Sequence, residues 1–163
     1  MCGIAGYVGD RESADVLVDA LSKLEYRGYD SAGIAVFDHG NIKVKKCKGR
    51  LANLVEKMDE EGKPQGHVGI GHTRWATHGE PSDINSHPHG NKRVTIVHNG
   101  IIENYQPLRD KLINKGYEFV SQTDTEVVAQ LLDYYYSGNP AEAIAKVMHR
   151  VVGSYAFGIM FVD

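Results

Sequence analysis

Two hydrophobic periodicities, mixed along one chain, most constrain what this sequence can fold into. Five segments place apolar residues at helical spacing, and seven shorter segments have the apolar patterns of strands. The two kinds do not alternate strictly, as they would in a doubly wound parallel sheet. The order therefore predicts an α+β fold with antiparallel sheets. The helical segments are 14–21, 51–58, 105–115, 128–135 and 144–151; the strand segments are 3–8, 31–37, 41–47, 68–72, 93–98, 117–120 and 154–162.

One hairpin and one interior strand stand out among these segments. The turn residues of Asp38–Asn41 predict a hairpin between the strands on either side. In the second of these strands, aliphatic residues alternate with lysines, so one face is expected to meet water. The first, Ser31–Phe37, is apolar on both faces and is expected in the interior of its sheet.

Composition narrows the possible functions. The chain has 163 residues with a net charge of −3, which argues against a general binder of nucleic acid or anionic membranes. No apolar run reaches the roughly 18 residues of a membrane span. The N-terminus lacks the pattern of a signal peptide, so we expect a cytoplasmic protein in which Cys2 and Cys47 are not joined by a disulfide.

The second residue is a cysteine, and this gives the N-terminus a chemical interpretation. Removal of Met1 would leave Cys2 with a thiol and a free α-amine on one residue. The amine, with a pKa of about 7.7–8.0, can accept the thiol proton, so one residue supplies both nucleophile and base. The alternative is that Cys2 is only a small buried residue that opens a strand.

A strand expected to end at His98 leads into Asn99 and Gly100. The Asn99 amide and the Gly100 N–H are two donors that could converge on one oxygen. Acyl transfer needs such a pair to stabilise the oxyanion of its tetrahedral intermediate. The alternative is an ordinary hairpin turn, because Asn-Gly is a frequent turn dipeptide.

The loop after residue 72 contains Arg74 and Trp75. The guanidinium offers a bidentate fork for a carboxylate, and a loop tryptophan can act as a lid or gate. The alternative is a core tryptophan beside a surface arginine.

Residues 122–126 precede a helical segment. Thr123 and Glu126 have the spacing of a capping box, which would explain this sequence without any function. Asp124 is not needed for that cap, so its carboxylate is a candidate partner for an ammonium group.

Histidines are concentrated in one part of the chain, since five of the eight fall between His72 and His98. They could form a metal site, with His87 and His89 as an H-x-H pair. No cysteine joins them, and the nearby acidic residues lack motif spacing. We therefore expect hydrogen-bonding histidines, no metal site and no cofactor.

Six strings from residue 2 to residue 126 together carry a family resemblance. They are Cys2-Gly3-Ile4, Tyr26-Arg27-Gly28-Tyr29-Asp30-Ser31-Ala32-Gly33, Gly71-His72-Thr73-Arg74-Trp75-Ala76-Thr77-His78-Gly79, Asn85 with His87-Pro88-His89, His98-Asn99-Gly100 and Thr123-Asp124-Thr125-Glu126. The chain resembles the glutaminase domains of class II glutamine amidotransferases, which have the N-terminal-nucleophile hydrolase fold. Within that group it is most similar to the glucosamine-6-phosphate synthase branch.

The resemblance implies a four-layer α-β-β-α sandwich and a set of roles. Cys2 would attack the side-chain amide of glutamine, and Asn99 with Gly100 would hold the oxyanion. The carboxylate clamp falls on Arg74 and the ammonium partner on Asp124. Two neighbours of Arg74, Thr77 and His78, complete the substrate-binding set, and Trp75 matches a gating tryptophan beside the ammonia route.

The resemblance also implies a larger enzyme of amino-sugar biosynthesis. Its second half, a sugar-phosphate isomerase-like unit, would use the ammonia to convert fructose 6-phosphate to glucosamine 6-phosphate. That half is absent from residues 1–163, and homo-oligomers are expected only through it. The glutaminase domain itself is expected to be incomplete on its C-terminal side. The alternatives are a fragment that binds glutamine without hydrolysing it, through truncation or retained Met1, and the glutaminase domain of another class II amidotransferase.

Overall fold

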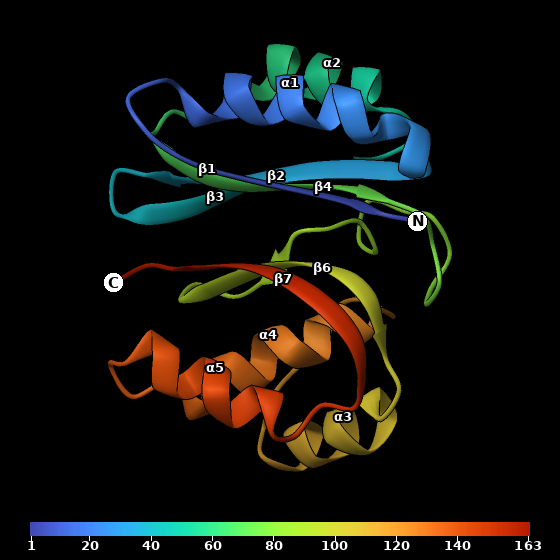
Figure 1. The fold of residues 1–163 in the computed structure, drawn as a ribbon, viewed down its shortest axis with the longest axis vertical. Coiled ribbons are helices and arrows are strands. Elements are labelled where there is room, and N and C mark those ends of the chain that lie inside the picture. The colour runs from blue at the N-terminus through green and yellow to red at the C-terminus, as the bar shows by residue number, and fades with distance from the viewer.

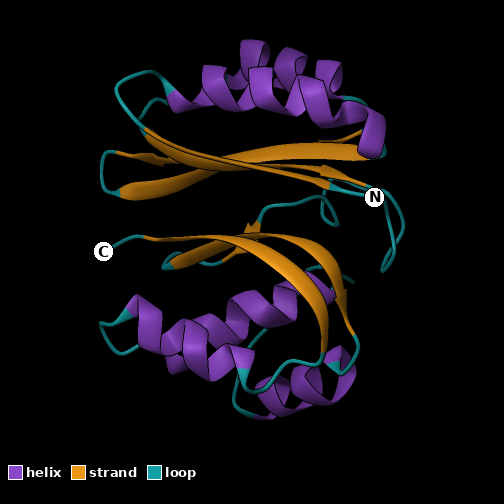
Figure 2. Ribbon diagram, in the orientation of Figure 1, coloured by secondary structure: helices purple, strands orange, loops and turns teal.

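Two antiparallel sheets lie face to face, and helices cover the outer side of each (Figure 1). The computed structural model describes residues 1–163. The colouring by secondary structure makes the layer order clear: helices, sheet, sheet, helices (Figure 2). The expected α+β class and four-layer sandwich are confirmed. None of the helices is long and apolar enough to cross a membrane.

The first sheet has the strand order β1-β4-β2-β3. Its outer face is covered by α1 and α2, whose apolar residues pack on β2 in one core cluster. Full burial of a residue such as Leu17 contributes about 1.5–3 kcal/mol. The elements are β1 (Gly3–Val8), α1 (Ser13–Leu24), a single 3-10 turn η1 (Glu25–Arg27), β2 (Ser31–Asp38), β3 (Asn41–Lys48), α2 (Leu51–Glu61) and β4 (Val68–Arg74).

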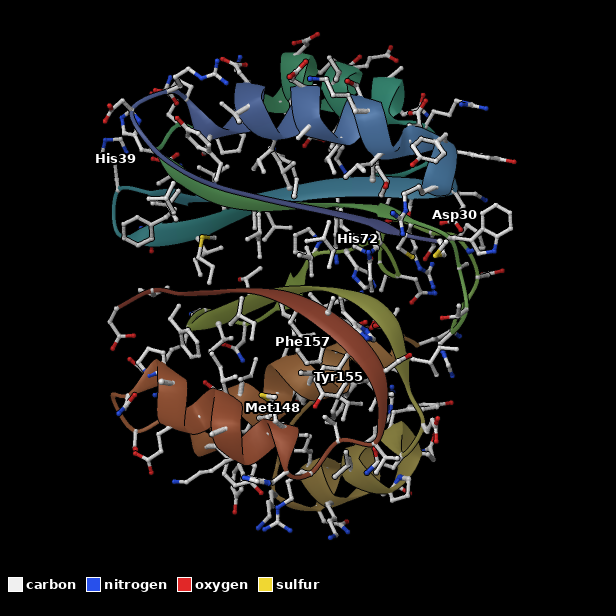
Figure 3. All side chains as sticks on the ribbon, viewed as in Figure 1. Asp30, His39, His72, Met148, Tyr155 and Phe157 are labelled. Carbon is white, nitrogen blue, oxygen red and sulfur yellow. The ribbon has the colours of Figure 1, made fainter.

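The second sheet has the order β5-β6-β7 and carries the other three helices. Tyr155 and Phe157 of β7 point toward these helices (Figure 3) and pack on the largest core cluster. The elements are β5 (His89–Gly90), β6 (Val94–Ile102), α3 (Tyr105–Asn114), α4 (Asp124–Tyr135), α5 (Pro140–Met148) and β7 (Gly153–Phe161).

Most expected elements are confirmed. β2 and β3 form the hairpin, with Asp38 opposite Asn41, and β2 lies inside its sheet. Helix α5 begins with Asn139 accepting a hydrogen bond from Glu142 N and with Pro140 in its first turn. It ends at Met148, three residues before the predicted end of its apolar pattern.

One strand prediction is wrong, and another strand was predicted to end too early. Residues 117–120 form no strand, because side chains of α4 take up their backbone groups: Gln130 donates to Glu118 O, and Glu126 accepts from Val120 N. The strand predicted to end at His98 runs on to Ile102, because β7 pairs with it along its whole length. The short β5 was not predicted.

The contacts between the two sheets differ from one end to the other. At one end, Ala35, Ile70, Val97 and Met160 form an apolar cluster. Toward the other end, His72 lies between the sheets (Figure 3), and its Nε2 bonds to His98 O at 2.9 Å. The polar cluster at this end, named so from here on, consists of His72, His87, His89, His98, Thr123 and Thr125.

Candidate active site

The predicted site residues converge at the end of the sandwich where the chain begins. The start of β1, the end of β4, the middle of β6 and the start of α4 meet there. A pocket of about 490 Å³ opens beside Cys2, and a narrower recess adjoins it. The pocket is lined by Met1, Cys2, Arg27, Trp75, Thr77, Asn99, Gly100, Ile101 and Ser154, and the recess by Cys2, Arg74, Trp75, Thr77, His87, His98, Gly100, Thr123, Asp124 and Thr125.

The Cys2 thiol borders both cavities. Its Sγ accepts a hydrogen bond from Trp75 N at 3.1 Å and lies 3.5 Å from Trp75 O. Burial raises the pKa of the thiol, while the Trp75 N–H acts in the opposite direction because it stabilises a thiolate. Met1 is present beside it, and its Sδ accepts a hydrogen bond from Arg27 at 3.4 Å. The thiol of Cys2 is therefore placed at the edge of a pocket.

Asn99 and Gly100 lie inside β6, so the hairpin-turn interpretation is wrong. Asn99 Nδ2 donates to Cys2 O at 3.0 Å, which links β6 to the residue before β1. The Asn99 amide nitrogen carries a second N–H, which this hydrogen bond does not use. Gly100 has a φ of +128°, and a Cβ there would lie 2.0 Å from Ser154 O, so the position requires glycine.

The structure places Arg74 in the interior and Trp75 at the surface, so the alternative of a core tryptophan beside a surface arginine is wrong. Arg74 is 3% exposed and Trp75 is 52% exposed. The guanidinium donates to three carbonyl oxygens of the following loop, those of His78, Gly79 (3.0 Å) and Glu80 (3.4 Å). Of the five N–H donors of an arginine, two are left for a ligand. Burial lowers the pKa of Arg74, and the charge of Asp30 acts against this.

Thr77 and His78 follow on the same loop. Thr77 lines both cavities, and its hydroxyl lies 3.3 Å from His78 Nδ1. The same nitrogen is 3.8 Å from Asp124 Oδ1. The loop therefore approaches the start of α4 across the narrow recess.

Asp124 is the first residue of α4 and is almost fully buried. Its Oδ2 accepts from Ile102 N at 2.9 Å, and no hydrogen bond engages its Oδ1. The capping prediction is confirmed in part, since Thr123 Oγ1 accepts from Glu126 N at 3.3 Å. The carboxylate of Glu126 does not bond back to Thr123; it accepts from Val120 N and Ser121 N.

The clustered histidines take part in hydrogen bonds and ring stacking. His72 and His87 stack with ring centroids 3.9 Å apart, and Thr125 Oγ1 bonds His98 Nδ1 at 2.9 Å. Burial lowers the pKa of His72 to about 3, and also lowers the pKa values of His87, His89 and His98. No three His, Cys, Asp or Glu side chains are placed to hold a metal ion. The metal interpretation therefore has no ligand set.

Sequence reasoning did not assign roles to two residues that build the site. Gly28 has an extended backbone, and a Cβ there would lie 2.7 Å from the Arg74 carbonyl. Asp30 accepts from Ala76 N and donates its own N–H to Arg74 O. Both belong to the Tyr26–Gly33 string, which was singled out by resemblance, but only the fold places that string against residues 74–76.

Comparison with known proteins identifies the family of this chain. A family model described as a glutamine amidotransferase domain matches residues 72–163. The chain is 60% identical to a glutamine–fructose-6-phosphate aminotransferase (isomerizing) from Clostridium acetobutylicum, over 98% of this chain and 26% of that protein. One from Caldanaerobacter subterraneus is 58% identical, over 100% of this chain and 27% of that protein. This chain therefore spans about a quarter of the length of these curated relatives.

A solved structure supports the same assignment. Glutamine phosphoribosylpyrophosphate amidotransferase from B. subtilis has a TM-score of 0.85 to this structure at 28% identity, over 99% of this chain and 35% of that chain. The family model covers more than half of this chain. The chain belongs to the glutamine amidotransferase family and is homologous to the glutaminase half of the glutamine–fructose-6-phosphate aminotransferases.

Proposed function

We propose that this chain hydrolyses the side-chain amide of glutamine and that the ammonia is used to aminate fructose 6-phosphate. The observation that carries the proposal is the position of Cys2, whose thiol borders a pocket shared with Asn99 and Gly100 and a recess shared with Arg74 and Asp124. The sugar acceptor rests on the names of the relatives at 58–60% identity.

Substrate binding follows from the charges of the recess. The two N–H groups of Arg74 that the loop carbonyls leave over bind the α-carboxylate of glutamine. Asp124 Oδ1 accepts a hydrogen bond from the α-ammonium, while Oδ2 stays bonded to Ile102 N. Thr77 and His78 border the same end and complete the binding set. Two opposite charges at fixed positions orient the side-chain amide toward Cys2.

The chemical steps use the first residue of the processed chain. After removal of Met1, the α-amine of Cys2 accepts the thiol proton, and the sulfur forms a bond to the amide carbon of glutamine. Asn99 Nδ2 and the Gly100 N–H stabilise the resulting oxyanion. The C–N bond then breaks, and the nitrogen takes up the proton and leaves as ammonia. Water attacks the thioester, which releases glutamate and restores the thiol.

The wider setting is part of the same proposal. Residues 1–163 form the glutamine-hydrolysing unit, and Trp75, half exposed beside Tyr29, gates the exit of ammonia. A sugar-phosphate isomerase-like unit outside these residues receives the ammonia and carries the contacts of a homo-oligomer. The nucleophile must stay reduced, and Cys2 and Cys47 are both free, which fits the cytoplasm.

A second state of the chain is the one that retains Met1, whose Sδ accepts a hydrogen bond from Arg27. With Met1 retained, the Cys2 nitrogen is part of a peptide bond and cannot act as the base. We propose that this form binds glutamine in the recess without hydrolysing it. The intact mass of the purified protein reports which form is present.

Cys2→Ala tests the proposed reaction directly. The variant should lose glutamate release from glutamine by at least about 10⁴-fold, because no other thiol lies in the pocket. Cys47→Ala is the matched control, since Cys47 is buried in the first core cluster away from the site, and it should retain turnover. Undiminished turnover by Cys2→Ala would exclude the proposed function.

Asp124→Asn tests the ammonium partner. The amide retains an oxygen for Ile102 N but loses the charge, so the KM for glutamine should rise about 10–100-fold with a smaller change in kcat. Steady-state kinetics give both constants. An unchanged KM would remove this role from Asp124.

A further inference from the structure

Asn85 is a buried amide whose hydrogen bonds connect two separate parts of the site. It is 3% exposed. Its Nδ2 donates to Glu80 O at 2.9 Å and to Gln122 Oε1 at 3.1 Å, while its Oδ1 accepts from Gln122 N at 2.9 Å. The side chain therefore joins the loop after β4 to the segment before α4.

The two partners lead to opposite sides of the recess. The carbonyl of Glu80 also accepts from Arg74, together with the carbonyls of His78 and Gly79. Gln122 lies two residues before Asp124 in the chain, at the start of α4. Asn85 is the only residue hydrogen-bonded to both segments, and the contact between His78 and Asp124, at 3.8 Å, is longer than a hydrogen bond.

The segment that carries Asn85 is itself anchored to the first sheet. Lys46 Nζ on β3 donates to the carbonyls of Ser86 at 2.9 Å, Pro88 at 3.0 Å and Ile84 at 3.4 Å. Asp83 accepts from Lys48 N at 2.8 Å. These bonds fix the backbone on both sides of Asn85, so the Asn85 side chain is attached to a rigid segment.

Packing leaves no room for the loop to move toward Asn85. Gly79 has a φ of +82°, and a Cβ there would lie 2.6 Å from Asn85 Nδ2. The loop therefore rests directly on the amide. Without the amide, residues 78–80 would keep their bonds to Arg74 but lose their hydrogen-bonded connection to Gln122.

We propose that Asn85 is a positioning residue that sets the distance between the Arg74 side of the recess and Asp124. The inference rests on the proposed binding of glutamine between these two residues. A ligand held by its carboxylate at one side and its ammonium at the other needs this separation to be fixed, because each charged contact forms only at hydrogen-bonding distance. Asn85 acts through other residues and does not touch the substrate.

The test is Asn85→Ala, measured for binding and for turnover. Binding is measured by calorimetry with glutamine in a Cys2→Ala background, so that no hydrolysis interferes. The Kd should rise about 10-fold or more, whereas kcat in the protein with Cys2 should stay within about 3-fold. Alkylation of Cys2 by iodoacetamide should keep its rate, because Asn85 makes no contact with the nucleophile.

A double-variant cycle with Asp124→Asn identifies how Asn85 acts. When Asp124 no longer binds the ammonium, its placement matters less, so Asn85→Ala should raise the Kd by less than about 3-fold in that background. Asn91→Ala is the matched control. It also removes bonds to one side chain and two backbone N–H groups, but at the turn between β5 and β6, and it should leave the Kd unchanged.

Each other result overturns the inference. A Kd unchanged by Asn85→Ala excludes the role, and fully multiplicative effects with Asp124→Asn show that the residue does not act through that carboxylate. A parallel loss of kcat, Cys2 alkylation and thermal stability would mean that Asn85 only supports the fold. Failure of the proposed function would be seen separately, as glutamine binding without any turnover in protein with Cys2 whose intact mass shows that Met1 has been removed.

Discussion

The two ends of the contact between the sheets differ in chemistry, although β4 and β6 contribute to both. The apolar cluster joins β2 and β4 to β6 and β7 through Ala35, Ile70, Val97 and Met160. The polar cluster joins β4 to β6 and to the start of α4 with four histidines and two threonines, beside Cys2 and Asp124. The difference separates a part of the molecule that holds the layers together from a part that holds a site.

The energetic costs of the two clusters also differ. Apolar contacts need no hydrogen-bond partners and contain no titratable groups. The apolar cluster therefore stabilises the sandwich at any pH. In the polar cluster, His72 Nδ1, His87 Nδ1 and His98 Nε2 are buried without a hydrogen-bond partner, and each such group costs about 1–3 kcal/mol. The end with the proposed chemistry is therefore the less stable of the two.

Acid should affect the polar cluster most. The pKa values of His72, His87 and His89 are lowered by burial, that of His72 to about 3. Below about pH 6.5 the unfolded chain takes up protons that the folded chain does not, so stability present above that pH is lost as the pH falls. Each histidine that stays neutral in the folded chain lowers the free energy of unfolding by about 1.4 kcal/mol at pH 5.5, and three together lower it by about 4 kcal/mol. Urea unfolding at pH 7.5 and 5.5 measures this loss, and equal stability at both values would contradict it.

A substitution in the apolar cluster should instead give a loss that does not depend on pH. Ile70→Ala removes a buried side chain between the sheets and should lower the free energy of unfolding by about 3 kcal/mol. Urea unfolding of this variant at pH 7.5 and 5.5 should show the same acid loss as the wild-type protein. A changed pH dependence would mean that the two clusters are coupled through the sheets.

The smallest expected difference is in the stability lost when the N-cap of α4 or of α5 is removed. Thr123 caps α4 within the polar cluster and also bonds His89 Nε2 at 3.1 Å and Ser121 Oγ at 2.9 Å. Asn139 caps α5 at the surface with one bond, to Glu142 N. Thr123→Ala should therefore cost about 2 kcal/mol and Asn139→Ala about 1 kcal/mol. Thermal or urea unfolding compares them, and equal losses would show that the extra bonds of Thr123 add no stability.

Local sequence determined most of the secondary structure. The apolar spacing of residues 14–21 is enough to predict α1, and the turn at Asp38–Asn41 is enough to predict the β2–β3 hairpin. Residue chemistry was also enough to single out Cys2 as a candidate nucleophile and Asp124 as a carboxylate not needed for the cap. These predictions depend on neighbours close in sequence, which is why one chain suffices for them.

The tertiary structure decided which residues far apart in the sequence come into contact. Asn99 and Gly100 became part of a strand because β7 pairs beside them, and residues 117–120 lost their predicted strand because α4 takes up their backbone groups. The burial of Arg74 and the bridge made by Asn85 also depend on segments far away along the chain. Most of these contacts join segments that are far apart in the sequence, and no local pattern indicates which distant segments meet. The sequence alone determined the elements and their chemical groups; only the packing of the two sheets decided which groups share one pocket.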